Sequence, residues 1–251
     1  MPVTAADIVF YGSATMAEND VTTNIGGAVD TTAKVVFTDI SATGVVTAVS
    51  DNVADTTQTL TVTGRDASGV IVSDIITLAG TTPVSTTQAF ERIMKMVLSA
   101  ATTGIVSVTD SAAAAVATFE PGVLQVRRIF YDVAADATGG VIRRYYEKIF
   151  SRNNNATLAL TNAVISEQSD LTGKVAFALE SVLDGTDTNG IGNNRQVAPT
   201  GYVFDSLAKN VANTQNHSPG SAQGIWLELT LNPGDVATKT VYTLRESGTS
   251  V

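Results

Sequence analysis

Residues 51–84 read DNVADTTQTLTVTGRDASGVIVSDIITLAGTTPV, and this stretch decides the expected fold. Residues 60–63 alternate Leu and Val with Thr, which is the period-two pattern of a strand that buries one face. Turn-forming residues follow at 65–69, and a second run rich in β-branched residues occupies 70–78. The stretch therefore predicts an antiparallel hairpin.

The composition extends this expectation to the whole chain. Its 251 residues are 44% hydrophobic, with many Thr, Val, Ala and Gly, so the chain has enough apolar side chains for one large or two ordinary cores. β-branched residues suit a pleated sheet and Gly suits turns. We expect an all-β protein.

Short strand candidates recur at regular spacing between residues 34 and 120. They cover residues 34–40, 44–49, 58–64, 70–78, 83–90, 92–98, 104–109 and 115–119. Because two sheets are needed to cover both apolar faces, this spacing predicts an immunoglobulin-like β-sandwich over 34–120.

Residues 121–251 are expected to form a second β-sandwich domain with a long polar loop at 183–224. Its strand candidates are 124–132, 141–150, 157–165, 174–179, 225–231 and 239–244, and residues 204–211 have a short helical pattern. The boundary is placed at Glu120, Pro121 and Gly122, because Pro and Gly often end a unit and the charge balance changes there.

The first 33 residues have little periodic hydrophobicity and hold Gly12, Gly26 and Gly27. They are expected to form an extended N-terminal arm. Two interpretations stay open with equal weight: an arm that pairs with the sheet edge of a neighbour, or a poorly ordered terminus.

Charge and cysteine content exclude several classes of partner. The net charge of −9 would repel phosphate backbones and anionic lipids, so we expect no nucleic acid and no membrane as partners. No stretch reaches the length of a membrane span and no secretion signal is expected. The absence of cysteine fits synthesis in a reducing cytoplasm.

The sequence contains no recognisable catalytic or metal-binding motif, and we expect no enzyme, no cofactor and no metal site. His217 is the only histidine, and without a nucleophile elbow it is expected to be a solvated loop residue. Residues 184–190, DGTDTNG, resemble a calcium loop, but the twelfth position is Arg195 where a bidentate Glu is required, so a solvated turn is favoured.

One constellation stands out as a hypothetical partner interface. If the strands at 124–132 and 141–150 pair about Gly139 and Gly140, they form a basic, aromatic patch. Arg and Tyr are favoured at protein interfaces. The alternative of equal weight is that these charges lie at sheet edges and pair with Asp132 and Glu147. The interface residues are Arg127, Arg128, Arg143, Arg144, Tyr145, Tyr146, Lys148 and Arg152.

The motif at residues 55–84, followed by AFERIMKMVLS at 89–99, resembles a sandwich module of tailed-bacteriophage virion proteins. The opening MPVTAADIVFYGSA and the ending SAQGIWLELTLNPGDVATKTVYTLRESGTS also look like those of phage structural proteins. The resemblance covers nearly the whole chain but rests on strand and turn residues, without a chemical signature.

The resemblance implies a non-enzymatic capsid cement or decoration protein. Such a protein would bind the outer capsid surface, bridge subunits of the major capsid protein, and self-associate as a trimer or dimer on the virion. The alternatives are a tail, baseplate or head-to-tail joining protein, or a glycan-binding adhesion module that displays aromatics such as Trp226.

Overall fold

The computed structural model describes residues 2–131, 133–137, 139–170, 172–236 and 241–250. Within these residues the protein is all-β, as predicted, and its one helical element is a single 3-10 turn, η1 (Val211–Asn213). The chain divides into two compact units. The first contains residues 1–30 and 130–251, and the second contains residues 31–129. None of the helices in the described ranges is long and apolar enough to cross a membrane.

The N-terminal residues expected to form an arm carry two strands. Strand β1 (Ile8–Thr15) belongs to the first unit, and β2 (Gly26–Lys34) runs from the first unit into the second. β1 pairs antiparallel with β11 (Arg143–Asn153), with Ile8 opposite Asn153 and Gly12 opposite Ile149. Residues 8–12 are thus paired with a strand of their own unit.

The second unit contains two sheets. One has the order β10-β7-β4-β5, with the last residues of β2 parallel to β10, and the other has the order β6-β3-β8-β9. The strands are β3 (Val46–Ser50), β4 (Thr59–Arg65), β5 (Ile71–Thr77), β6 (Val84–Ser85), β7 (Arg92–Leu98), β8 (Val106–Asp110), β9 (Ala115–Phe119) and β10 (Gln125–Arg127).

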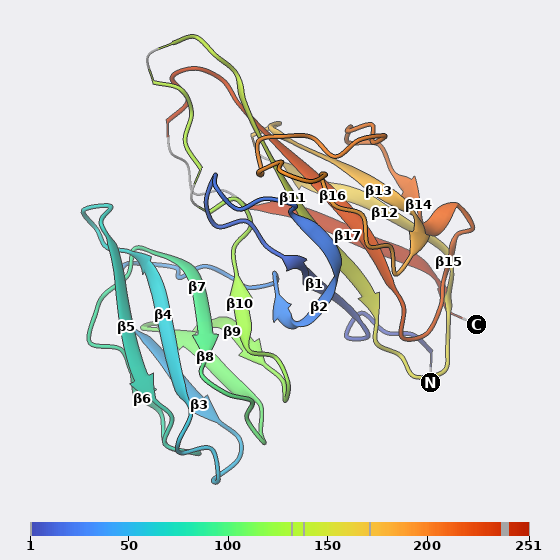
Figure 1. Cartoon of the computed structure of the whole chain (residues 1–251). Coiled ribbons are helices and arrows are strands. Elements are labelled where there is room, and N and C mark those ends of the chain that lie inside the picture. Colours follow the sequence, from blue (N-terminus) through green and yellow to red (C-terminus); the bar gives the residue numbers. More distant parts are fainter. Residues whose placement is uncertain (1, 132, 138, 171, 237–240, 251) are drawn as a thin grey trace. The chain divides into compact units, whose positions relative to one another are not determined.

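The hairpin predicted at 58–78 is confirmed as β4 and β5 (Figure 1). Leu60 and Val62 are fully buried while their Thr neighbours are half-buried, as the alternation predicted. Gly69 closes the turn with a φ of +78°, a conformation that costs Gly little. The Asp66 carboxylate accepts the backbone N–H of Ser68 at 2.8 Å and so fixes the turn.

Both sheets of the second unit supply one hydrophobic core. It includes Val46 and Val108 from one sheet and Leu60, Met96 and Val126 from the other, all at most 1% exposed. A core shared in this way buries the inward face of every strand that contributes to it. Burial of apolar area is the main stabilising term for such a unit.

Two strand predictions in this unit are wrong. Residues 35–40 form no strand: the chain leaves β2, and the N–H of Thr38 bonds the carbonyl of Val116 beside the other sheet at 2.8 Å. A segment that passes between two sheets cannot continue one ladder of hydrogen bonds. Of the strand predicted at 83–90, only the two residues of β6 form a strand.

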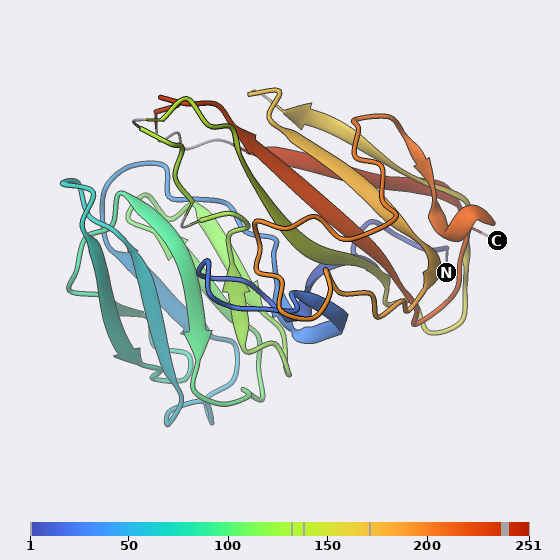
Figure 2. The same cartoon turned by 45° about the horizontal axis from the view of Figure 1, so that its top comes forward.

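The first unit also has two groups of paired strands. One has the order β13-β16-β11-β1, and in the other β14, β15 and β17 all pair with β12. The long strands β11 and β16 run side by side in both views (Figures 1 and 2). Their antiparallel pairing begins with Arg143 opposite Leu231 and continues without a break to Arg152 opposite Ala222. The remaining strands are β12 (Leu160–Asp170), β13 (Val175–Leu183), β14 (Lys209–Asn210), β15 (Asn216–His217), β16 (Ala222–Leu231) and β17 (Tyr242–Ser250).

β16 differs from its predicted environment. The alternation at 225–231 predicted a strand with one exposed or partner-facing side, but residues 222–227 are buried on both faces. Trp226 is 0% exposed, so it cannot serve as the surface platform suggested for a glycan. The helical pattern at 204–211 is also not realised, because residues 209–210 form β14 and only η1 is helical there.

Candidate functional site

The predicted basic patch is divided between the two units. Arg127 and Arg128 lie in the second unit, and the residues from Arg143 to Arg152 lie in the first. The expected hairpin about Gly139 and Gly140 does not form, because β10 pairs with β2 and β7 whereas β11 pairs with β1 and β16. Both edges of β11 are therefore occupied by strands other than β10.

Several of the patch residues are buried. Arg127, Tyr145 and Lys148 are at most 1% exposed, and Tyr146 is 5% exposed. Arg128 forms an ion pair with Asp39; burial lowers the pKa of its guanidinium, and the Asp39 carboxylate opposes that shift. Arg127, Tyr145, Tyr146 and Lys148 are thus largely inaccessible to a partner, and the Arg128 side chain is 18% exposed.

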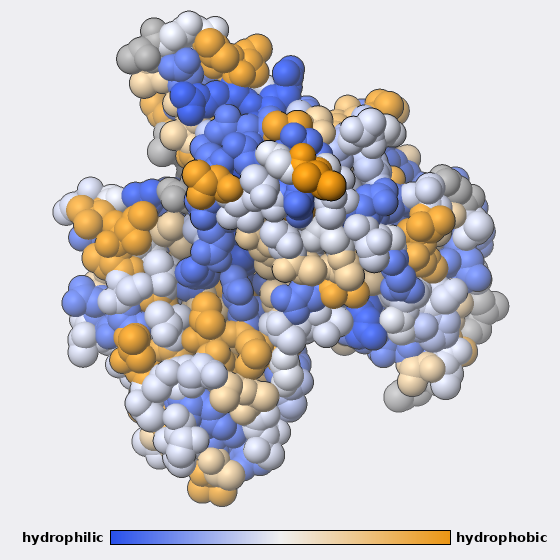
Figure 3. All heavy atoms as spheres, in the orientation of Figure 1, coloured by the Kyte–Doolittle hydropathy of each residue, from blue (hydrophilic) through white to orange (hydrophobic). Residues whose placement is uncertain are grey.

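The exposed members gather where β11 begins. A groove of about 500 Å³ is lined by Arg143 and Arg144 together with the exposed Val141 and Ile142. Tyr146, Asp136 and Gln196 complete its lining. In Figure 3 hydrophobic and strongly hydrophilic residues lie side by side over this end of the first unit.

Glu228 lies beside Arg144 in this groove. Glu228 accepts a hydrogen bond from the Tyr146 hydroxyl at 2.6 Å, and its carboxylate lies 3.9 Å from Nε of Arg144. The Arg144 side chain remains 52% exposed, so a partner can reach it. Arg152 is less available, because it donates to the carbonyl of Gly220 and to the side chain of Asn154.

Lys148 is the centre of a buried polar network. Its Nζ lies 2.6 Å from Oε1 of Glu180 and also donates to the carbonyls of Gly27, Asp187 and Gly185 at 2.8, 3.1 and 3.3 Å. Burial lowers the pKa of Lys148 and raises the pKa of Glu180, and their mutual attraction opposes both shifts. The pair thereby fixes residues 185–187 against the strands.

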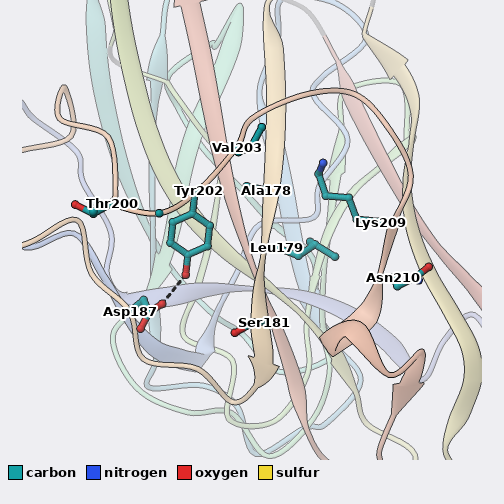
Figure 4. Close-up of a pocket in the computed structure, with 10 residues that line it drawn as sticks. Ala178, Leu179, Ser181, Asp187, Thr200, Tyr202, Val203, Lys209 and Asn210 are labelled. Atoms are coloured by element: carbon teal, nitrogen blue, oxygen red, sulfur yellow. Dashed lines mark hydrogen bonds between the residues drawn. The ribbon is translucent and has the colours of Figure 1, made fainter.

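A second cavity lies beside this network. It measures about 410 Å³ and is lined by β13, by the 187–203 segment and by β14. The Tyr202 hydroxyl donates to Asp187 at 2.5 Å on one side, and Lys209 and Asn210 lie on the other (Figure 4). Ser181 is exposed at its margin.

His217 is buried, so the prediction of a solvated loop histidine is wrong. Its Nδ1 lies 2.6 Å from Oε1 of Glu246, and its Nε2 donates to the carbonyl of Ser221 at 3.0 Å. Ser151 donates to the other oxygen of Glu246. Because Nε2 is bound to a carbonyl and Ser151 faces the carboxylate, these groups are not arranged as a nucleophile with its base.

The calcium-like segment is used for local structure. Oδ1 of Asp184 accepts the N–H of Ala222 at 2.9 Å, Asp187 accepts the Tyr202 hydroxyl, and the Asn189 amide donates to the carbonyl of Asn194 at 2.7 Å. Within the described part of the chain, no group of three or more acidic, His or Cys side chains converges on a metal position.

Sequence reasoning missed Glu180, Glu228 and Glu246, the three carboxylates around which these contacts are built. A signal existed for Glu180, since it is the single charge in the β13 sequence VAFALESVL, whose other residues are apolar apart from Ser181. No protein-family model, curated protein or solved structure matches this chain.

Proposed function

We propose that this chain is a structural protein of a tailed-bacteriophage virion, and that it acts as a capsid cement or decoration protein. In this proposal both units are β-sandwiches, the second of immunoglobulin type. Each presents its outer faces to the major capsid protein or to another copy of the chain, in a dimer or trimer. No catalysis is required of it.

The observation that best supports the proposal is the groove at the start of β11. Arg143 and Arg144 lie there beside Val141 and Ile142, which are 58% and 48% exposed. Exposed aliphatic residues next to arginines are typical of the centre of a protein interface. The charges of these two arginines favour an acidic patch on the partner, although the chain as a whole carries a net charge of −9.

The test is the occupancy of the chain on purified particles. The double variant Arg143→Gln/Arg144→Gln removes both charges, and we expect binding to particles that lack the chain to weaken about 100-fold, if each arginine contributes about 1.4 kcal/mol. Arg245→Gln is the matched control, because Arg245 is an exposed arginine of the same unit outside the groove.

Electron cryo-microscopy of the particles then distinguishes the capsid from the tail. Density for the chain on the outer shell supports the decoration role, and density in the tail or baseplate supports the alternative virion role. Absence of the chain from purified particles, or equal binding of the double variant and the control, would refute the proposal.

A further inference from the structure

We propose that the cavity between β13, β14 and the 187–203 segment is a binding site for a neutral carbohydrate, with room for a monosaccharide or disaccharide. The site belongs to the first unit alone, and the inference does not depend on whether the chain is part of a virion. Its volume of about 410 Å³ lies within the usual range of small-ligand pockets.

The lining offers the functional groups that a sugar ring needs. Hydrogen-bond acceptors and donors come from Asp187, Ser181, Thr200 and Asn210, while Leu179 supplies an apolar surface. The ring of Tyr202 adds an aromatic face. A sugar presents hydroxyls at its rim and C–H groups on its faces, so both kinds of surface can be satisfied at once.

The charged groups at the cavity already have hydrogen-bond or ion-pair partners, which favours a neutral ligand over an ionic one. Nζ of Lys209 lies 2.6 Å from Asp205 and 5.2 Å from the centre of the Phe177 ring. The Asp187 carboxylate receives the Tyr202 hydroxyl. An anionic ligand would have to displace Asp205 from Lys209, whereas a sugar hydroxyl can donate to the remaining lone pairs of Asp187.

The cavity is also held rigid by buried groups. The backbone N–H of Asp187 donates to Glu180 at 3.1 Å, and its carbonyl accepts bonds from Lys148 and from the N–H of Gly27. Tyr202 packs against Trp226, with ring centroids 6.1 Å apart. Groups positioned before binding lose little conformational entropy when the ligand arrives, which increases affinity.

Binding is tested with the full chain on an array of soluble mono- and oligosaccharides and, in a separate arm, with purified bacterial cell-surface polysaccharides. The two arms distinguish a free sugar from a surface glycan. We expect at least one carbohydrate to bind, and saturation-transfer NMR to detect contact with an aromatic ring.

Two variants locate the site. Ser181→Phe fills the cavity margin, Asp187→Asn removes the charged acceptor, and each should weaken binding at least about tenfold. Ser206→Phe is the matched control, since Ser206 is exposed between the 187–203 segment and β14 but does not line the cavity. Unfolding curves establish that the variants are folded. The proposal is overturned if no carbohydrate binds in either arm, or if the folded Ser181→Phe and Asp187→Asn variants bind as well as the control.

Discussion

Replacement of Lys148 by Met tests whether the buried ion pair stabilises the first unit. The side chains of Lys148 and Glu180 are 0% and 1% exposed, and their charged atoms lie 2.6 Å apart. Met has a similar length but cannot donate, so the substitution leaves the Glu180 carboxylate and three backbone carbonyls without the ammonium. Breaking a buried pair on one side costs about 3–5 kcal/mol.

This free energy predicts a large thermal shift. For a unit of this size, about 1 kcal/mol lowers the Tm by about 2–4 °C, so the variant should melt about 10 °C lower. The double variant Lys148→Met/Glu180→Leu removes both charges and should recover most of the loss, because apolar side chains can replace a buried pair at little cost. Lys174→Met is the control: its pair with Asp235 is about one-fifth exposed and should contribute less than about 1 kcal/mol.

Trp226 fluorescence provides the assay. Trp226 is the only tryptophan of the chain, it belongs to the first unit, and its ring lies 5.7 Å from Nζ of Lys148. Unfolding in urea or on heating can therefore be followed for this unit specifically. If Lys148→Met were no less stable than Lys174→Met, or if the double variant were as unstable as Lys148→Met, the reasoning would be refuted.

Two further predictions concern other buried carboxylates. In the second unit, hydrogen bonds from Ser41 and from the N–H groups of Ala114 and Ala112 lower the pKa of Asp110 from 3.8 to about 2. A lowered pKa stabilises the fold above about pH 4, and this contribution is lost as the pH falls from about 4 through 2. Asp110→Asn should thus be less stable at neutral pH and lose less stability on acidification, as acid titration of circular dichroism would measure; an unchanged acid transition would contradict this. In the first unit, His217→Phe leaves the buried Glu246 with the Ser151 hydroxyl but without the imidazole and should cost about 3 kcal/mol in urea unfolding. A loss below about 1 kcal/mol would indicate that Glu246 finds another partner.

The parts of the fold that depend on residues close together in the sequence could be predicted. The hairpin of β4 and β5 follows from alternation at 60–63 and turn chemistry at 65–69, both of which act within a few residues. All-β architecture follows from the same local preferences repeated along the chain. Strand pairing could not be predicted in this way, because β1 and β11 are separated by more than a hundred residues.

The same limit explains the basic patch. A period-two pattern assigns side chains to two faces, but it does not say which strand covers each face. Tyr146, Lys148 and Phe150 share one face of β11, and an apolar neighbour on each side of Lys148 was a signal for its burial. Arg143 and Arg144 are the first two residues of β11, and their side chains remain exposed to solvent.

Lys148 also connects the stability of the first unit with the proposed carbohydrate site. The ammonium binds the carbonyls of Gly185 and Asp187, and Glu180 binds the N–H of Asp187, so the pair holds the segment that carries one wall of the cavity. An apolar pair at 148 and 180 could restore the free energy of unfolding, but it would provide no bond to that segment. The Lys148→Met/Glu180→Leu variant should therefore be stable and yet bind carbohydrate more weakly, because the fold is kept while the segment with Asp187 is no longer held in place.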